Sequence, residues 1–456
     1  MPKTDRLFIK LKEMVGEANM IQDPDKLKAY AIDGKKPKVV VTPGTIDEVS
    51  KVVAYAGQEH LAIVPRGNGS KMEMGGIPKK MDIVLSTLRL DRVTDRDCEN
   101  LTLSAESGLT LGEVQQGLAK VGKGYFLPLD PPFTDKATLG GIVATNSSGP
   151  KRLLYGTARD MMIGAKAVFP NGDIVVSGGK TVKNVSGYDM CKLLIGSYGT
   201  LGILCEMTFK LLPLPGKEAT LLLSFAGLEN ADDFVRELRG GQLIPSSLEI
   251  LNAKAVQKMK YPVSIPPNGN FLVAIGVEGV TESTDRQISE MSEIGKKHGT
   301  LEALTLDAEK HQAFWVALRD FTYGVTQEYP NAISLKSNFL ISKSGEMLGE
   351  YEKIAQGLGI DCASISHAGN GILYSHILPG KNFRSKVESF VELIEKLTAE
   401  AVKYGGGLVV ESSPLSVKKK VNVWGQSRSD YLVARRLKEQ IDPAGILNIG
   451  RFVGGI

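Results

Sequence analysis

A loop with two glycines, PRGNGS (65–70), has the residue types that can bind a phosphate group. Successive backbone N–H groups in such a loop can surround an anion, the Ser70 hydroxyl is a further donor, and the Arg66 guanidinium adds positive charge. A nicotinamide-binding G-x-G-x-x-G turn would need a third glycine at the position of Met72, so that class of dinucleotide site is not indicated. Taken alone, the loop is equally compatible with an ordinary tight turn.

Further phrases rich in glycine and small hydroxyl residues follow between 128 and 211, separated by apolar segments. At such positions the backbone can turn tightly or approach a flat or anionic group closely. Because several occur in succession, they indicate one large ligand that extends along the domain. The phrases are PLDPP (128–132), TLGGIVATNSSGP (138–150), YGTARD (155–160), KTVKNVSGYD (180–189) and GSYGTLGI (196–203).

Alternating strands and helices place these loops at the ends of secondary-structure elements. An apolar strand over 61–65 leads into the phosphate-type loop, and an earlier strand and helix complete a β-α-β unit. Capping-box pairs, Thr45 with Glu48 and Thr110 with Glu113, predict where two helices begin.

After residue 215 the glycine loops become rare and polar helices alternate with strands such as FLVAIGVEG (271–279). A helix over 283–299 and a long helix over 382–404 belong to this part. The alternation favours an antiparallel sheet with helices on one face, an α+β domain.

Composition excludes several classes of protein. A formal net charge of +4 over 456 residues, with basic residues scattered among acidic ones, argues against a nucleic-acid partner. The four cysteines lie far apart without a C-x-x-C pair, so we expect free thiols in a reducing cytoplasm rather than a disulfide framework or an iron–sulfur or zinc centre. The N-terminus lacks a signal-like apolar region and no long apolar run follows, so we expect a cytoplasmic protein without direct membrane insertion. Any association with the inner membrane would come through a partner.

Together, the loop phrases resemble the FAD-binding domain of the vanillyl-alcohol-oxidase/PCMH superfamily, in its glycolate oxidase and D-lactate dehydrogenase branch. The resemblance extends from Asp23 to Phe452 and is most specific over 126–211. It implies an α+β fold: a PCMH-type FAD-binding domain of two α/β subdomains plus an α+β cap domain with an antiparallel sheet. The expected limits are 1–35 for N-terminal helices, 36–215 for the FAD-binding domain, 216–405 for the cap, and 406–456 for a C-terminal segment that returns to the FAD-binding domain.

The resemblance also implies which residues bind FAD. The loop at 65–70 wraps the pyrophosphate in this family, and 128–131, 138–148 and 198–203 line the ribityl chain and isoalloxazine. Because 66–70 contain no histidine, FAD is expected to be non-covalent; Tyr198 stands where the family usually has glutamate. The expected cofactor-binding residues are Arg66, Gly67, Asn68, Gly69, Ser70, Pro128, Asp130, Thr138, Leu139, Gly140, Gly141, Thr145, Asn146, Ser147, Ser148, Gly199, Thr200, Leu201, Gly202, Ile203 and Asn448.

The acid–base residues of the family are incomplete in this chain. Catalytic members carry H-x-G-D-G-N-x-H and a later E-H-G, which supply metal ligands and the base. Here the first motif reads HAGNGILY (367–374), which keeps His367 but ends in Tyr374, and the second keeps Glu411 with Ser412 at the position of the base. The resemblance therefore implies intact flavin loops beside a degraded acid–base site.

A metal site is not predicted from the residues that remain. His376 lies two residues after Tyr374 and so shares a strand face with it, which makes His376 a possible replacement ligand. One or two histidines with one carboxylate are a thin ligand set for a divalent ion, so we interpret His367 as a hydrogen-bonded residue retained with the fold. A residual site formed by His367, His376 and Glu411 stays open.

Two cations fall where relatives hold the acid group of the substrate, Arg319 in FWVALRD and Lys336 in SLKSN. A guanidinium can bind a carboxylate through two parallel hydrogen bonds, which an ammonium cannot imitate. Arg319 could equally be a solvated helix residue or form an ion pair near Asp320. With His367, these are the candidate catalytic residues.

The tract 178–203 is especially similar to the FAD-binding (E-type) subunits of glycolate oxidase, paralogues of a catalytic flavoprotein subunit. The expected function is thus an FAD-binding subunit of a multi-subunit 2-hydroxy-acid (glycolate or lactate) dehydrogenase that relays electrons. Its expected partners are the paralogous catalytic flavoprotein and an iron–sulfur subunit. The alternatives are an autonomous FAD-dependent D-2-hydroxy-acid dehydrogenase and a flavin-free scaffold subunit.

Overall fold

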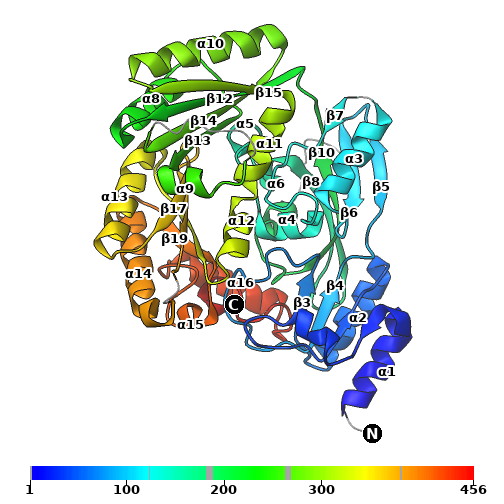
Figure 1. Ribbon diagram of the computed structural model, residues 1–456. Helices are drawn as coiled ribbons and strands as arrows, with labels where there is room; N and C mark the ends of the chain where they lie inside the picture. The colour runs from blue at the N-terminus through cyan, green and yellow to red at the C-terminus, as the bar shows by residue number, and fades with distance from the viewer. Residues whose placement is uncertain (1–2, 123, 181–187, 262–268, 381–382) are drawn as a thin grey trace. The chain divides into compact units, whose positions relative to one another are not determined.

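The computed structural model describes residues 3–122, 124–180, 188–261, 269–380 and 383–456 (Figure 1). Most of the phrase KTVKNVSGYD, at 181–187, therefore lies outside the described residues. The chain divides into two compact units: unit 1 is Met1–Ser148, Gly156–Leu214 and Ser427–Ile456, and unit 2 is Gly149–Tyr155 and Pro215–Gln426. The short segment Gly149–Tyr155 thus belongs to unit 2, although its neighbours in sequence belong to unit 1.

The first sheet of unit 1 has the order β1-β2-β4-β3 in the part that the structure describes. β2, β4 and β3 run parallel and β1 is antiparallel to β2. The predicted β-α-β unit is present, because α2 connects β2 to β3; Thr45 caps α2 by accepting a hydrogen bond from Glu48 N, while the Glu48 carboxylate accepts from Gly44 N. The elements are α1 (Lys3–Val15), β1 (Met20–Ile21), β2 (Val39–Val41), α2 (Ile46–Gln58), β3 (Ile63–Arg66) and β4 (Ile83–Ser86).

The second sheet of unit 1, in the order β5-β6-β10-β8-β9, is antiparallel throughout. α3 begins at the predicted capping box, in which Thr110 and Glu113 exchange both hydrogen bonds. Side chains of α3, α4 and this sheet form one apolar core. The elements are β5 (Val93–Asp97), β6 (Thr102–Glu106), α3 (Leu111–Val121), β7 (Tyr125–Phe126), α4 (Leu139–Thr145), α6 (Ala158–Met161), β8 (Met162–Val168), β9 (Ile174–Gly178), α7 (Met190–Leu194), β10 (Ile203–Lys210), β11 (Leu212–Pro213) and α16 (Asp430–Ile441).

Unit 2 is built on a large antiparallel sheet with the order β15-β12-β14-β13-β17-β18-β16-β19 among the described residues. The predicted strand 271–279 is β14, and the predicted helices near 283–299 and 382–404 are α10 and α14. The strands are β12 (Lys217–Phe225), β13 (Ser247–Asn252), β14 (Phe271–Gly279), β15 (Glu302–Asp307), β16 (Ile333–Asn338), β17 (Cys362–His367), β18 (Ile372–Ile377) and β19 (Gly407–Ser412).

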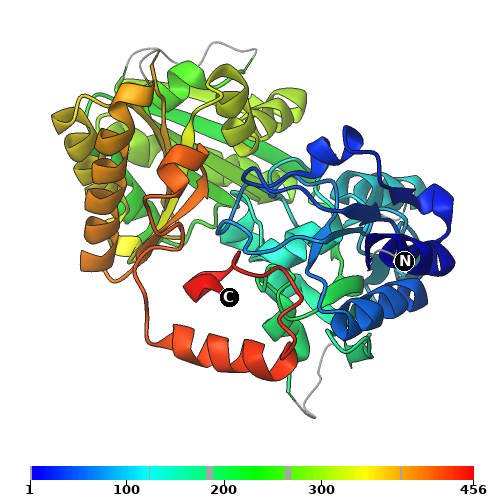
Figure 2. The same cartoon turned by 90° about the horizontal axis from the view of Figure 1, so that it is seen from below.

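Helices cover both faces of this sheet, so the prediction of helices on one face was wrong in this respect. α8, α10, α13 and α14 pack on one face, where α13 and α14 lie side by side (Figures 1 and 2). α9, α11 and α12 pack on part of the opposite face against a cluster that includes Phe314 and Trp315. The helices are α5 (Arg152–Tyr155), α8 (Leu228–Gly240), α9 (Ala253–Lys258), α10 (Thr281–Lys297), α11 (Ala308–Arg319), α12 (Phe321–Glu328), α13 (Ser344–Gly357), α14 (Val387–Lys403) and α15 (Leu415–Lys418). The chain thus has the predicted α+β fold with an antiparallel cap sheet.

The face of the unit 2 sheet that carries α9 and α11 also carries a row of polar side chains, which we call the polar face. Strand register puts these residues on one side, because directly opposed residues and residues two apart share a face. Its polar residues are Glu218 and Thr220 of β12, Glu278 of β14, Glu249 of β13, His367 of β17, Tyr374 and His376 of β18, and Ser334 and Lys336 of β16.

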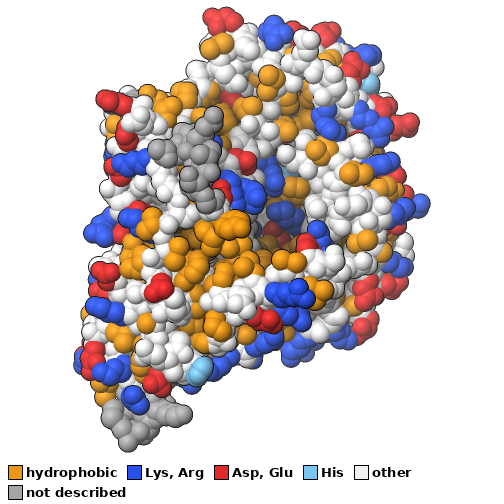
Figure 3. All heavy atoms as spheres, turned by 180° about the vertical axis from the view of Figure 1, so that it is seen from behind, with side chains coloured by type: hydrophobic (Ala, Val, Ile, Leu, Met, Phe, Trp, Pro, Cys, Tyr) orange, Lys and Arg blue, Asp and Glu red, His pale blue; other side chains and the backbone are white. Residues whose placement is uncertain are grey.

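The surface carries both signs of charge. On the face of the molecule seen in Figure 3, Lys and Arg side chains are interspersed with Asp and Glu. None of the helices in the described ranges is both long enough and apolar enough to cross a bilayer.

Candidate functional site

A cleft in unit 1 lies where the predicted loops meet. The space between its walls is about 790 Å³ when the part open to solvent is included. Every residue that lines it belongs to unit 1. The lining is Pro65, Arg66, Gly67, Asn68, Gly69, Ser70, Lys71, Met72, Thr87, Thr138, Gly140, Gly141, Ala144, Thr145, Tyr198, Gly199, Gly202, Ile203, Leu204, Asn448 and Arg451.

The cleft is open because several of the residues that line it are glycines. A Cβ added at Gly141 would meet only the Thr138 hydroxyl, at 3.2 Å, so a larger side chain there would extend into the cleft. Gly199 has a φ of +64° and its Cβ would lie 3.1 Å from Pro65 Cγ, so both backbone conformation and space require glycine. The cleft therefore depends on missing side chains at the positions that the sequence marked.

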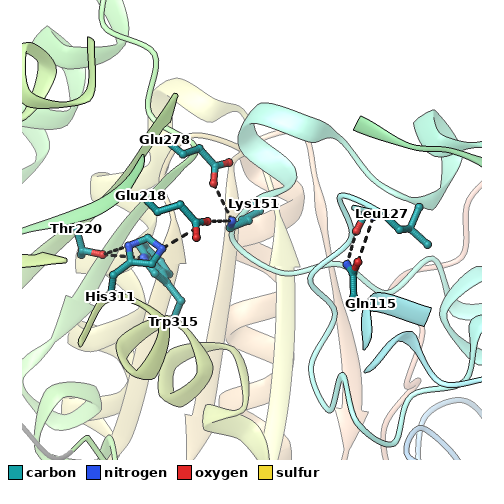
Figure 4. Close-up of polar contacts among 8 residues, drawn as sticks. All are labelled: Gln115, Leu127, Lys151, Glu218, Thr220, Glu278, His311 and Trp315. Carbon is teal, nitrogen blue, oxygen red and sulfur yellow. Dashed lines mark hydrogen bonds and ion pairs between the residues drawn. The ribbon is translucent and has the colours of Figure 1, made fainter. Parts of the chain in front are cut away.

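Hydrogen bonds fix the loops around the cleft. The Thr138 side chain caps α4 by accepting from Gly141 N at 3.2 Å, and Asn68 Nδ2 donates to Lys136 O at 2.9 Å. Gln115 of α3 pairs with the backbone of Leu127 through both amide atoms, at 2.7 and 3.2 Å, and so holds the chain directly before Pro128 (Figure 4).

The charges of the cleft favour an anion. Arg66, Lys71 and Arg451 line it, and no acidic residue is found in its lining within the described part of the chain. Burial lowers the pKa of the Arg66 guanidinium, which lies 4.5 Å from the centroid of the Tyr30 ring. Arg451 is 2% exposed, donates to Met72 O at 2.8 Å, and has a pKa lowered by burial. The Asp33 carboxylate acts on the pKa of Arg451 in the opposite direction, and a diphosphate would add further negative charge beside these cations.

Most of the residues expected to bind FAD line the cleft, and the others lie near it in sequence. α4 explains part of the difference, because its lining residues share one helical face while Leu139 points into the core with no exposed surface. Those that do not line the cleft are Pro128, Asp130, Leu139, Asn146, Ser147, Ser148, Thr200 and Leu201.

Sequence reasoning missed Arg451, Met72 and Lys71 as lining residues. Arg451 follows Asn448 in the phrase NIGRF, and a cation so close to a predicted ligand turn was the available signal. Tyr198 was noted only as a departure; it has a φ of +59° and lines the cleft. Its ring is tilted by 30° relative to that of Phe452, with the ring centroids 5.5 Å apart.

Asn448 presents a buried acceptor at the cleft. Its backbone has a φ of +50°, its Nδ2 donates to Tyr198 O at 2.5 Å, and its N–H donates to Ile63 O at 2.8 Å. Its Oδ1 is buried and has no hydrogen-bond partner among the described residues. Since buried polar atoms are normally satisfied, a ligand with an N–H or O–H donor fits this position.

The candidate catalytic residues lie in unit 2. His367 is the last residue of β17, and its Nδ1 lies 2.5 Å from Glu249 Oε2. Its ring and that of Tyr374 form a T-shaped pair with ring centroids 5.2 Å apart. Both members of this His–Glu pair are buried. The pair is what the sequence could not show, because Glu249 is 118 residues away on β13.

Lys336 and His376 occupy the same face. Lys336 Nζ lies 5.5 Å from the centroid of the Tyr374 ring, and burial lowers its pKa while the Glu411 carboxylate acts in the opposite direction. His376 Nδ1 lies 3.0 Å from Ser334 Oγ, and burial lowers its pKa to about 4. At neutral pH His376 is therefore an uncharged, hydrogen-bonded imidazole.

Arg319 is the last residue of α11 and does not belong to the strands that form the polar face. Its Nε is 3.5 Å from Asp320 Oδ1 and its side chain is 18% exposed. The local pairing near Asp320 that the sequence left open is thus present. In the described ranges, no group of three or more His, Cys, Asp or Glu side chains is arranged to hold a metal ion.

The comparisons with known proteins bear on the whole chain. The sequence matches an FAD binding domain over residues 37–178 and the C-terminal domain of FAD linked oxidases over residues 214–452. It is 28% identical over 420 residues to glycolate oxidase subunit GlcD of Bacillus subtilis, covering 91% of this chain and 89% of that protein. It is 29% identical over 421 residues to a D-lactate dehydrogenase of Archaeoglobus fulgidus, covering 91% of each.

A solved structure shares the fold. That of p-cresol methylhydroxylase matches with a TM-score of 0.76 and 16% identity, over 98% of this chain and 96% of that one. These matches confirm the predicted superfamily and the predicted cofactor. The chain belongs to the FAD-linked oxidases, with a PCMH-type fold, and is an FAD-dependent oxidoreductase.

Proposed function

We propose that the chain is the FAD-binding subunit of a multi-subunit 2-hydroxy-acid dehydrogenase of the glycolate or lactate class. The observation that carries the proposal is the contrast between the two sites. The cleft of unit 1 has cations, open space and an acceptor that suit FAD, whereas the polar face of unit 2 lacks the imidazole that relatives use as a base.

FAD fits the residues of the cleft. The Arg66 guanidinium and the backbone of 67–70 would hold the pyrophosphate, as the resemblance implies, and Arg451 would add charge. The buried Asn448 Oδ1 would accept a hydrogen bond from the cofactor. Among the described residues, neither histidine nor cysteine lines the cleft, which supports non-covalent binding.

When bound, FAD would supply a centre that can take up two electrons and release them singly. Oxidation of a hydroxy acid at this FAD would also need the chain's own residues. The chain must then supply a group that takes the hydroxyl proton and cations that hold the carboxylate. Lys336 is the candidate anchor on the polar face, and Arg319 is the second, although Asp320 competes for its guanidinium.

The group that would take the proton is missing. Ser412 occupies the position of the base and lies opposite Ser334 in the β16–β19 register, where a hydroxyl with an ordinary pKa cannot act as a base near neutral pH. His376 is buried against Ser334 and Phe321. The proposal is therefore that the hydroxy acid is oxidised mainly on a paralogous catalytic flavoprotein.

Electrons on this chain's FAD would leave through a partner. Iron–sulfur ligation commonly uses four thiolates, and the four cysteines of this chain are unpaired and lie apart. An iron–sulfur subunit is accordingly the proposed acceptor. Any contact of such a complex with the inner membrane would also come through a partner.

A second candidate function, an autonomous D-2-hydroxy-acid dehydrogenase, is favoured by the Glu249–His367 pair. A carboxylate at 2.5 Å orients an imidazole and stabilises its protonated form, which is how histidine bases are activated elsewhere. In this candidate His367 takes the proton of the hydroxyl group.

Anaerobic mixing of the purified full-length protein with D-lactate or glycolate separates the candidates. The relay subunit keeps its yellow flavin absorbance under these conditions and gives dye reduction only with its catalytic partner. Rapid bleaching of the flavin in the isolated chain would overturn the relay proposal. His367→Ala and Glu249→Gln should leave the flavin content intact, and they abolish bleaching only if the second candidate is right.

A further inference from the structure

α16 (Figure 2) follows unit 2 in the sequence and belongs to unit 1. Lys438 is the one residue of this helix that is buried. Lys438 is 7% exposed, while Leu432 and Val433 on the same helix are more than half exposed. Helices normally attach to a domain through an apolar stripe. A buried ammonium in that position needs an explanation, because lysine is among the side chains least often buried.

The Lys438 ammonium joins three acceptors. It donates to Thr200 O at 2.7 Å and to Leu447 O at 2.9 Å, and it forms an ion pair with the Asp442 carboxylate. An ammonium has three N–H groups, so each has an acceptor. Burial lowers the pKa of Lys438, and Asp442 acts in the opposite direction.

Asp442 holds the backbone on the other side of the pair. It ends α16, is 2% exposed, and its Oδ1 and Oδ2 accept from Ile446 N at 3.0 Å and Leu447 N at 2.9 Å. The next residue is Asn448, which lines the cleft. Leu447 is thus held at both its N–H and its C=O by one ion pair.

Both carbonyls that Lys438 joins sit beside residues that line the cleft. Thr200 lies between Gly199 and Gly202, and Leu447 precedes Asn448. The loop at 198–203 and the turn at 446–448, which form two walls of the cleft, are far apart in the sequence. They are also joined directly, because Asn448 Nδ2 donates to Tyr198 O. The buried Lys438 ammonium therefore forms hydrogen bonds to both walls.

We propose that Lys438 and Asp442 are positioning residues of the flavin site, which fix the loop at 198–203 against the closing turn at 446–448. The inference rests on the assignment of the cleft as the FAD site and not on the substrate. Without the ammonium, the carbonyls of Thr200 and Leu447 would lose this donor, and the Asp442 carboxylate would keep its two backbone donors but lose its cation. The loop and the turn would then separate to admit water. Asn448 Oδ1 would then lose its fixed position.

The test is FAD affinity of the full-length apoprotein, measured by quenching of FAD fluorescence, with melting temperatures recorded with and without FAD. For Lys438→Met we expect affinity weaker by about tenfold or more and a smaller rise of the melting temperature on adding FAD. Lys438→Arg, which keeps a charge and several donors, should recover part of the affinity. The matched control is Lys418→Met, since Lys418 is equally buried but belongs to unit 2.

A purely structural role predicts a different pattern. Lys438→Met would then lower the melting temperature equally with and without FAD, as Lys418→Met does, and the affinity of the folded protein would stay within about twofold. That result would overturn the proposal. If Lys438→Met does not fold, Asp442→Asn decides, because it keeps the ammonium and one acceptor: weaker FAD binding supports positioning and unchanged binding refutes it. Since no hydroxy acid is present, failure of the proposed function would not affect these measurements.

Discussion

Replacing Lys151 with methionine should destabilise unit 2 strongly, because this lysine bridges two carboxylates that face each other, of which Glu218 also lies beside His311. Glu218 on β12 and Glu278 on β14 are direct cross-strand partners, an arrangement that is unfavourable for like charges. Lys151 Nζ lies 2.6 Å from Glu218 Oε1 and 2.7 Å from Glu278 Oε2 (Figure 4). The lysine comes from Gly149–Tyr155, the segment that unit 2 takes from the sequence of the FAD-binding half.

The magnitude follows from burial. The side chains of Lys151 and Glu278 are 22% and 1% exposed, so the pair is largely shielded from water, whereas Glu218 at 28% is partly screened. Removing one partner of a buried ion pair costs about 3–5 kcal/mol, and partial exposure favours the lower end. A loss of about 3 kcal/mol corresponds to roughly 6–12 °C in the melting temperature of a domain of this size.

Tryptophan fluorescence is a suitable assay because both tryptophans, Trp315 and Trp424, belong to unit 2. Urea unfolding followed at this signal reports unit 2 alone. Lys217→Met is the matched control: Lys217 precedes Glu218 and pairs with Asp285, whose side chain is 58% exposed, so its loss should cost about 0–1 kcal/mol.

A double variant tests the mechanism. Burial raises the pKa of Glu278, so its carboxylate carries the penalty once the lysine is gone. Lys151→Met/Glu278→Gln should therefore be more stable than Lys151→Met. Because the pKa of Glu278 is raised in the folded protein, this carboxyl destabilises the fold least when it is protonated. The loss of unfolding free energy caused by Lys151→Met should therefore become smaller as the pH falls toward 5. Additive losses in the double variant, or a deficit independent of pH, would refute the electrostatic explanation.

Three further outcomes are expected. Gly141→Leu should abolish FAD retention, because the leucine side chain would extend into the cleft. The control is Gly117→Leu in α3, which should retain FAD, since a Cβ at Gly117 would meet only an arginine at 3.6 Å. Equal flavin content in the two variants would contradict the loop assignment. Arg451→Met should weaken FAD binding by more than about tenfold and the exposed Arg435→Met should not, as fluorescence titration at low salt would show. Burial lowers the pKa of His376 to about 4, so unfolding takes up a proton between pH 4 and 6.5. The free energy of unfolding should therefore decrease by about 2–3 kcal/mol as the pH falls through that interval. His376→Gln should make this pH dependence weaker in urea titrations.

The sequence was informative where a single segment determines its own conformation. The strand that ends at Arg66, the capping box at Thr110 and the glycine at 199 each follow from local rules of propensity, capping and steric space. For the same reason the cleft could be outlined from its loops. The family resemblance then supplied the cofactor, which local rules could not.

The remaining features depend on partners that are distant in the sequence. Glu249 meets His367 only because β13 and β17 are neighbours, and Lys151 meets Glu218 only because a short segment belongs to unit 2. Helical phase matters in the same way: Leu139 lies inside a run that otherwise lines the cleft, but it points to the core. Sheet order and register decide such contacts, and neither can be obtained from residue types alone.

The separation of the two units explains how a chain of this family can lose a base and still bind FAD. Every residue that lines the cleft belongs to unit 1, and the ion pair that we infer to hold its walls lies there as well. The candidate catalytic residues belong to unit 2, where Glu249 lies beside His367 and where Glu218 and Glu278 share Lys151. On the proposed function, the serine at 412 would remove proton transfer, and it would do so without changing a residue that lines the cofactor cleft.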